Sequence, residues 1–103
     1  MIGRLWHGWT AAGEDADAYE RFLSDELFPQ LDEIPGYRGG YVMRRPAADE
    51  AEFATLTLWE SIEAVREFAG DDYDRPVIEP EAARRLARYD DRVSHFETVV
   101  APG

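Results

Sequence analysis

The clearest pattern along the chain is a switch from two-residue to helical periodicity at Trp59-Glu60-Ser61. Side chains alternate over residues 53–59, as a pleated strand requires. This alternation gives two faces, one with Phe53, Thr55, Thr57 and Trp59 and the other with Ala54, Leu56 and Leu58. Neither face is strongly polar, so the sequence predicts a strand that is covered on both sides.

The residues after this strand have the marks of a short amphipathic helix. Ser61 is a natural N-cap, and Gly70 can end the helix. Between them, Ile62, Val65, Phe68 and Ala69 fall on one helical stripe. A strand that runs directly into a helix is therefore expected at this point of the chain.

The other segments give further strands and helices. Alternation and aromatic content predict strands at residues 2–10, 37–45 and 92–100. Helical spacing predicts a long helix at 13–33, which Pro29 should kink, and a short helix opened by Pro80 that carries Leu86 and Tyr89. The turn signal at 34–37 and the hairpin loop at 46–50 separate the strands. The predicted order is β-α-β-β-α-β.

This order is the split βαβ or ferredoxin-like pattern, an α+β fold with helices on one face of an antiparallel sheet. A chain of 103 residues makes one domain, 1–103, with room for one core. The row that contains Phe53, Thr57 and Trp59 is too apolar to face water. We therefore expect this row to lie on the bare face and to meet a second sheet in a homodimer.

Composition narrows the range of partners and compartments. The net charge of −11 argues against binding to nucleic acid or to an anionic membrane surface. No apolar run is long enough for a membrane span and no secretion signal is visible, so a cytoplasmic protein is expected. Cysteine is absent, which removes disulfides and thiolate chemistry. The absence of Lys and Asn favours a GC-rich coding bias, and the acidic excess leaves a salt-rich cytoplasm open.

Three motifs spread along the chain point to one family. They are the Ile34-Pro35-Gly36-Tyr37 turn after a long helix with a late proline, the Leu58-Trp59-Glu60-Ser61 junction leading to Phe68, and a final strand that bears a His. In these motifs the chain resembles the antibiotic biosynthesis monooxygenase family over nearly its whole length. The resemblance implies a dimeric α+β barrel. It leaves the activity open, because the family includes quinone-forming oxygenases, haem-degrading enzymes and members without a known reaction.

The haem-degrading branch of that family provides a direct comparison. The resemblance implies that haem degradation needs an Asn in the first strand and a Trp and a His in and after the second helix. Here the chain has no Asn, Phe68 takes the position of the Trp, and residues 77–79 contain no His. We therefore do not expect haem chemistry. Oxygenation without any cofactor is the activity that we expect instead.

Oxygenation without a cofactor needs a phenol or enol that is deprotonated in a dry pocket. The two histidines, His7 and His95, lie near the middle of the first and last predicted strands, which are neighbours in this topology. We expect both to open onto one pocket and one of them to act as the catalytic base. The alternative is that both are hydrogen-bonded structural residues in the core or in the dimer interface. No metal site is expected, because two histidines without matched carboxylates are an incomplete ligand set.

Four further residues are candidates for ligand binding. Trp6 and Phe68 offer flat apolar walls for an aromatic molecule. Arg4 can hold a phenolate or carboxylate if it points inward, and otherwise pairs with an acid. Tyr73 can donate a hydrogen bond to an anionic oxygen.

The sequence leaves the function open between two main hypotheses. The first is a homodimeric, cofactor-independent monooxygenase acting on an aromatic or quinol-like small molecule. The second is a non-catalytic dimeric barrel of the small-ligand-binding or stress type, in which the histidines are structural. A weaker third hypothesis is an isomerase or lyase, in which a His takes a proton beside a carbonyl. Oxygen consumption separates the first from the third.

Overall fold

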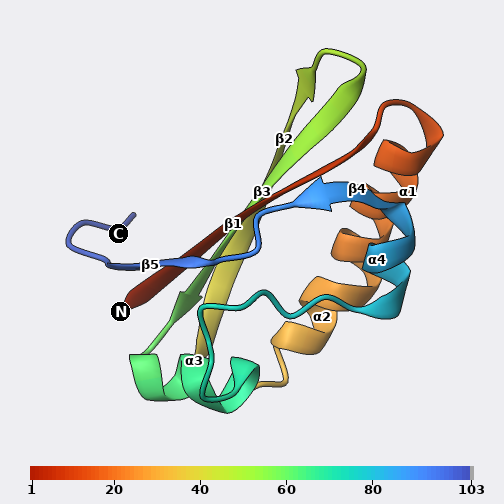
Figure 1. Ribbon diagram of the computed structural model, residues 1–103. Helices are drawn as coiled ribbons and strands as arrows, with labels where there is room; N and C mark the ends of the chain where they lie inside the picture. The colour runs from red at the N-terminus through yellow and green to blue at the C-terminus, as the bar shows by residue number, and fades with distance from the viewer. Residues whose placement is uncertain (103) are drawn as a thin grey trace.

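The alternating segments form one five-stranded antiparallel sheet. In the computed structural model, which describes residues 1–102, the strands are β1 (Ile2–Ala11), β2 (Tyr37–Ala47), β3 (Glu50–Trp59), β4 (Leu86–Tyr89) and β5 (Ser94–Glu97). Their order is β2-β3-β1-β4, and β5 pairs with the other end of β1. Figure 1 shows α1, α2 and α4 on one side of the strands, with α3 at the end of β3. The predicted α+β fold is confirmed.

The long helix predicted at 13–33 is a continuous run of three helical pieces. These are α1 (Glu14–Phe22), a π-helical turn η1 (Leu23–Leu27) and α2 (Phe28–Leu31). Pro29 has no N–H, and its ring would crowd the carbonyl four residues earlier in a regular α-helix. The wide π-helical turn before it relieves that conflict, so the helix changes type ahead of Pro29, and the predicted kink stays a prediction.

The junction after β3 has the predicted caps. Helix α3 (Ile62–Ala69) begins after Ser61, whose Oγ accepts a hydrogen bond from the Ala64 N–H at 3.2 Å. Such a cap contributes about 1 kcal/mol. At the other end, Gly70 adopts a φ of 89°, a conformation that favours glycine.

Two clusters of buried side chains form the core between β3 and the helices. In the first, Phe53 makes an edge contact with Tyr19 at a ring separation of 4.8 Å. In the second, Trp59 packs on Val65 and stacks on Phe68 with ring centroids 5.0 Å apart. Phe53 and Trp59 are no more than 1% exposed. Together these clusters fix the helices to one face of the sheet.

This packing corrects the predicted dimer interface. Phe53 and Trp59 lie beneath the helices of their own chain, and Thr57 accepts the Trp59 Nε1–H at 2.9 Å on the same side. Alternation along a strand separates two faces but does not say which one the chain's own helices cover. The covered face is the one with the larger side chains, because burying them contributes most to stability.

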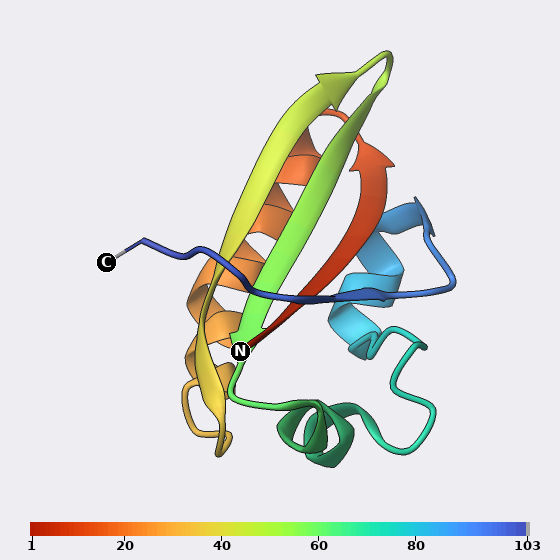
Figure 2. The same cartoon turned by 90° about the vertical axis from the view of Figure 1, so that its left-hand side faces the viewer.

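The other face of the sheet has no covering helix, and we call it the open face. It carries the side chains that alternate with the buried row, among them Leu5, Tyr41, Met43, Leu56, Leu58 and Phe96. Tyr41, Met43 and Phe96 are about half exposed, at 49%, 50% and 56%. Figure 2 shows this face toward the viewer, with α1 and α2 behind the sheet and the segment after β5 crossing in front.

The C-terminal third differs from the sequence prediction in two places. Helix α4 (Pro80–Arg85) ends before Leu86 and Tyr89, which lie in β4 rather than on the helix. The strand predicted at 92–100 is shorter and covers only β5. The cause is that β4 and β5 share one edge of β1, with β4 opposite Gly8–Thr10 and β5 opposite Ile2–Leu5.

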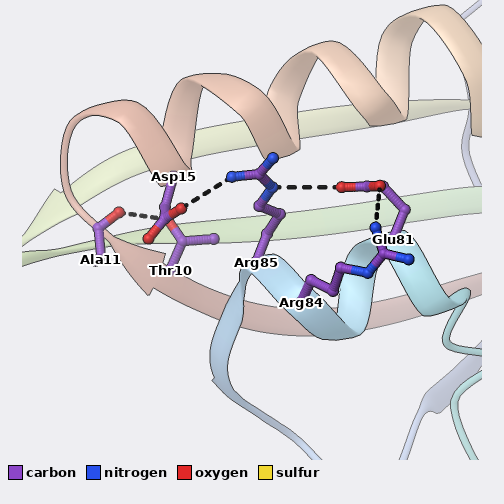
Figure 3. A network of polar contacts seen from close by, with 6 residues as sticks. All are labelled: Thr10, Ala11, Asp15, Glu81, Arg84 and Arg85. Atoms are coloured by element: carbon purple, nitrogen blue, oxygen red, sulfur yellow. Dashed lines mark hydrogen bonds and ion pairs between the residues drawn. The ribbon is translucent and has the colours of Figure 1, made fainter.

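A network of charged side chains joins α4 to the start of α1 (Figure 3). Arg85 contacts Asp15 of α1 at 3.2 Å and Glu81 of its own helix at 3.3 Å, and Arg84 contacts Glu81 at 3.3 Å. Pairs as exposed as these each contribute little to stability. They orient α4, which begins directly after a cavity-lining segment.

No helix within residues 1–102 is long and apolar enough to cross a membrane.

Candidate functional site

A cavity of about 70 Å³ lies between the sheet and the helices, and we call it the helix-side cavity. Its apolar walls come from the sheet, the long helix and α3: Trp6, Trp59, Leu23, Leu27, Phe28, Leu31 and Phe68. One side is closed by Pro76, Val77, Ile78 and Glu79, at the end of the irregular segment 70–79. We call this segment the strap, since it runs across the cavity from α3 to α4.

Four polar side chains besides Arg4 line the cavity: Tyr19, Thr55, Thr57 and Glu79. Burial raises the pKa of Tyr19, so its hydroxyl stays protonated and can donate a hydrogen bond. Thr55 and Thr57 come from the buried row of β3. The cavity is thus apolar in most of its area, with a few polar groups on its wall, as is usual for small-molecule sites.

Arg4 is the cation of this cavity and is only 6% exposed. Its Nη1 donates to the Tyr73 carbonyl at 2.6 Å and lies 2.9 Å from His95 Nε2, and its Nη2 donates to the Arg75 carbonyl at 3.3 Å. Burial lowers its pKa to about 10, which leaves it charged at neutral pH. Its guanidinium carbon lies 5.8 Å from the centre of the Phe68 ring. Arg4 therefore connects β1 to the strap and keeps a positive charge at the cavity wall.

His95 lies behind Arg4 and does not line the cavity. Its Nδ1 is 3.5 Å from Asp74 Oδ1, and its ring meets Tyr73 edge-on at 5.3 Å. Burial, and then the charge of Arg4, lower the pKa of His95. Because a guanidinium can only donate, Nε2 must accept, so the ring is neutral with its proton on Nδ1.

His7 lies on the open face. Its Nδ1 is 2.9 Å from Glu52 Oε2, and the other oxygen of that carboxylate accepts from Arg45 Nε at 2.8 Å. The hydrogen bond from Arg45, and then the one from His7, lower the pKa of Glu52. This site is separated from Arg4 by the sheet itself.

The expectation that His7 and His95 open onto one pocket is therefore wrong. His95 is paired with Arg4 across β5 and β1, and the two side chains share the helix side of the sheet. Residues 4 and 7 of one strand are separated by an odd number of positions, so they point to opposite faces. The prediction that the first and last strands are neighbours is confirmed, since β1 pairs with β5. Their register places the His7 and His95 rings on opposite faces of the sheet.

Three of the four predicted ligand-binding residues line the helix-side cavity: Arg4, Trp6 and Phe68. Tyr73 does not line it, since its ring packs on His95 and near Arg66. The indole N–H of Trp6 donates to the Asp90 carbonyl at 2.6 Å. Sequence reasoning missed Tyr19 and Glu79 as cavity residues. Tyr19 is on the apolar stripe of the long helix, which is the one signal that could have suggested it.

Comparison with known proteins gives a fold and no closer relationship. No protein-family model matches the sequence, and no curated protein matches it significantly. Among solved structures, the haem degrader MhuD of Mycobacterium tuberculosis is 20% identical, with a TM-score of 0.62 and 100% of both chains covered. SnoaB of Streptomyces nogalater, a cofactor-independent oxygenase, is 17% identical with a TM-score of 0.57, covering 97% of this chain and 95% of SnoaB.

A third similar structure is a Bacillus cereus protein regarded as an antibiotic biosynthesis monooxygenase. It is 15% identical, with a TM-score of 0.62, and covers 98% of this chain and 97% of its own. The chain therefore has the fold of the antibiotic biosynthesis monooxygenases, as the sequence resemblance implies. At these identities the likeness defines the fold, and the site has to be judged on its own residues.

Haem does not fit the residues of this cavity, although MhuD is solved with two haems in its active site. No His lines the cavity. Tyr19 is the remaining candidate for an axial ligand, and burial raises its pKa, which disfavours the phenolate that iron would need. Within residues 1–102, no group of three or more His, Asp or Glu is arranged to hold a metal ion.

Proposed function

We propose that the protein is a cofactor-independent monooxygenase that binds an aromatic or quinol-like small molecule in the helix-side cavity. The observation that carries this proposal is a buried guanidinium, Arg4, on the wall of an otherwise apolar cavity. Apolar walls suit a flat ring and exclude water, and a cation in such surroundings favours the ionised form of a phenol or enol. SnoaB, which has the same fold, is a cofactor-independent oxygenase.

The proposed reaction needs no electron donor beyond the substrate. The substrate anion gives one electron to dioxygen, and the resulting radical pair forms a carbon–oxygen bond. Loss of water from the peroxide then leaves a carbonyl at that carbon. One oxygen atom ends in the product and the other in water, and the substrate supplies all four electrons.

Polar groups on the cavity wall have distinct parts in this proposal. Arg4 stabilises the anion, and the hydroxyls of Tyr19 and Thr57 can donate to its oxygen. Glu79 is the carboxylate on the wall, and we propose that it accepts the proton of the substrate hydroxyl as the general base. Neither His7 nor His95 lines the cavity, so the predicted role of a histidine as base finds no support in the geometry.

An aromatic or quinol-like ligand is larger than the helix-side cavity, so the cavity must open to admit it. Small-molecule sites usually enclose about 300–1,000 Å³, and the helix-side cavity encloses about 70 Å³. The strap has no helix or strand between Gly70 and Glu79, so it can move without breaking a helical turn or a strand pairing. We propose that the ligand enters by displacing the strap.

We also propose that the protein is a homodimer that buries the open face. Leu5, Leu56 and Leu58 are flanked there by the half-exposed Tyr41, Met43 and Phe96. A stable interface buries about 800 Å² on each partner, and a sheet face of three long strands can supply such an area. The interface differs by one position along β3 from the sequence prediction, with Leu56 and Leu58 in place of Thr57 and Trp59.

One observation favours the second hypothesis, a non-catalytic ligand-binding barrel. The cavity holds no histidine, and Glu79 is its one carboxylate, so general-base catalysis depends on a single group. Such a protein would bind the same flat anion and release it unchanged.

Oxygen uptake distinguishes the two functions. We would supply anthrone as substrate, in buffer free of flavin and treated with a chelator, and follow oxygen with an electrode and anthraquinone by absorbance. The monooxygenase predicts equal amounts of oxygen consumed and anthraquinone formed, above the rate without protein. Binding of anthrone with no uptake above that rate would instead establish the second function.

Matched arginine variants tie the activity to the cavity. Arg4→Met should lower the rate by about 10–100-fold, because it removes the charge that stabilises the anion. Arg84→Met is the control, since Arg84 is exposed and, within residues 1–102, forms its ion pair with Glu81. Equal rates in both variants would contradict the assignment of the site.

A further inference from the structure

The strap is held at three consecutive residues, to Arg4 of β1 and to Val93 directly before β5. The carbonyls of Tyr73 and Arg75 accept from the guanidinium of Arg4, at 2.6 and 3.3 Å. Between them, the Asp74 carbonyl accepts from the Val93 N–H at 2.6 Å. Two of these three contacts therefore come from one side chain that also faces the cavity.

A chain of polar contacts connects the strap to the cavity wall through Asp74, His95 and Arg4. Asp74 Oδ1 lies 3.5 Å from His95 Nδ1, and His95 Nε2 lies 2.9 Å from Arg4 Nη1. The His95 side chain is 11% exposed, so water does not substitute freely for either partner. Because His95 offers its acceptor to Arg4, it fixes the direction in which the guanidinium points.

We propose that His95 is a positioning residue that holds Arg4 as the anion receptor of the helix-side cavity, and that Arg4 exchanges the strap carbonyls for an anionic oxygen of the ligand. This inference rests on the proposed function only in taking the cavity as the ligand site. The inference adds that the ligand is an anion and that its negative charge displaces the strap carbonyls from Arg4.

The exchange is physically reasonable because the competing bonds are of unequal strength. The Arg75 carbonyl is 3.3 Å from Nη2, a long contact for a charged donor. A carboxylate or phenolate forms shorter and stronger bonds with guanidinium than a neutral carbonyl does. The groups that face His95 are Arg4 of β1 and Asp74 and Tyr73 of the strap. A neutral ring satisfies the first two together, whereas a protonated ring would lose its acceptor and repel Arg4.

The test uses two probes of equal size and different charge, 2-naphthoate and 2-naphthamide. Their dissociation constants are measured by tryptophan fluorescence for the wild type and three variants. His95→Ala removes the acceptor, and His95→Gln restores it, because the amide can accept from Arg4 and donate to Asp74. Ser94→Ala is the control, from the same strand but on the open face.

The wild type should bind 2-naphthoate at least about tenfold more tightly than 2-naphthamide, since a charge-assisted pair is worth that much. His95→Ala should lose most of this preference, His95→Gln should recover it, and Ser94→Ala should keep it. A folded His95→Ala variant with the full preference would overturn the proposal, as would a wild type with none. If His95→Ala does not fold, His95→Asn replaces it, because its amide is too short to reach Arg4.

Hydrogen exchange of the strap amides gives an independent readout. Saturating 2-naphthoate should speed exchange at residues 73–75, and His95→Ala should do so without any ligand. If neither probe binds the wild type, the proposed function fails at this cavity. The exchange rates of unliganded His95→Ala then decide the positioning role alone: faster strap exchange supports it, and unchanged exchange refutes it.

Discussion

Replacing Arg4 by Met is predicted to cost little stability and most of the anion binding. Methionine keeps the unbranched stem and removes the guanidinium. Two firm hydrogen bonds are lost, to the Tyr73 carbonyl at 2.6 Å and to His95 at 2.9 Å, and a weaker one to the Arg75 carbonyl at 3.3 Å. Bonds to charged groups contribute about 1.5–3 kcal/mol each, so the two firm ones are worth about 3–6 kcal/mol.

Burial of the charge opposes this loss. Burial lowers the pKa of Arg4 from its ordinary value to about 10, and a change of that size corresponds to about 3 kcal/mol of free energy taken from the folded state. Methionine removes this penalty together with the bonds. The net change in the free energy of unfolding is therefore expected to be a loss of about 0–3 kcal/mol.

Urea unfolding followed by tryptophan fluorescence measures this quantity, with Arg84→Met as the exposed control. The same samples are titrated with 2-naphthoate. A destabilisation within the expected range, together with the loss of 2-naphthoate binding, supports a role of Arg4 in ligand binding rather than in stability. A loss of more than about 5 kcal/mol, or a variant that retains its affinity for 2-naphthoate, would refute the role of Arg4 as an anion receptor of low structural value.

Four smaller predictions follow from other parts of the fold. Leu56→Glu places a charge on the open face and should convert the proposed dimer to a monomer in sedimentation velocity; an unchanged sedimentation coefficient would argue against this interface. Gly36→Ala should lower the free energy of unfolding by about 2–4 kcal/mol, because φ is +87° and the new Cβ would lie 2.5 Å from the Ala64 Cβ. Ala48→Gly should raise it by about 0.5–1 kcal/mol, since Ala48 has a φ of 58° in a two-residue hairpin turn. Because the folded pKa of His95 is lowered, the unfolded state binds more protons, so stability should decline as pH falls below about 6.5, and His95→Gln should flatten this part of the pH profile.

The order of elements could be predicted from periodicity, caps and turns. Ser61, Gly70 and the 34–37 turn act locally, so their effects are visible in the sequence itself. The face of β3 that the helices cover could not be predicted, because Phe53-Trp59 and Leu56-Leu58 are both apolar rows and a one-residue difference reverses their roles. The division of the last strand between β4 and β5 depends on how β1 shares its edge, which is a tertiary property.

The candidate site could be predicted only in part, because the sequence indicates which strands are neighbours but not their register. Arg4, Trp6 and Phe68 line the cavity as expected, since residues 4 and 6 share a face of β1. The histidines were expected together because their strands are neighbours, but the register sets them on opposite sides of the sheet. Tyr19 and Glu79 reach the cavity through helix and strap positions, which periodicity does not reveal.

Tryptophan indole signals offer the most direct test of the helix-side cavity as the ligand site. The three tryptophans divide between the two sides of the sheet, with Trp6 and Trp59 on the cavity wall and Trp9 stacked on His7 at the open face. In a ¹H–¹⁵N NMR titration with 2-naphthoate, we expect saturable shifts of the Trp6 and Trp59 indole signals and a stationary Trp9 signal. A shift of the Trp9 signal alone would place the ligand on the open face and contradict binding in the helix-side cavity.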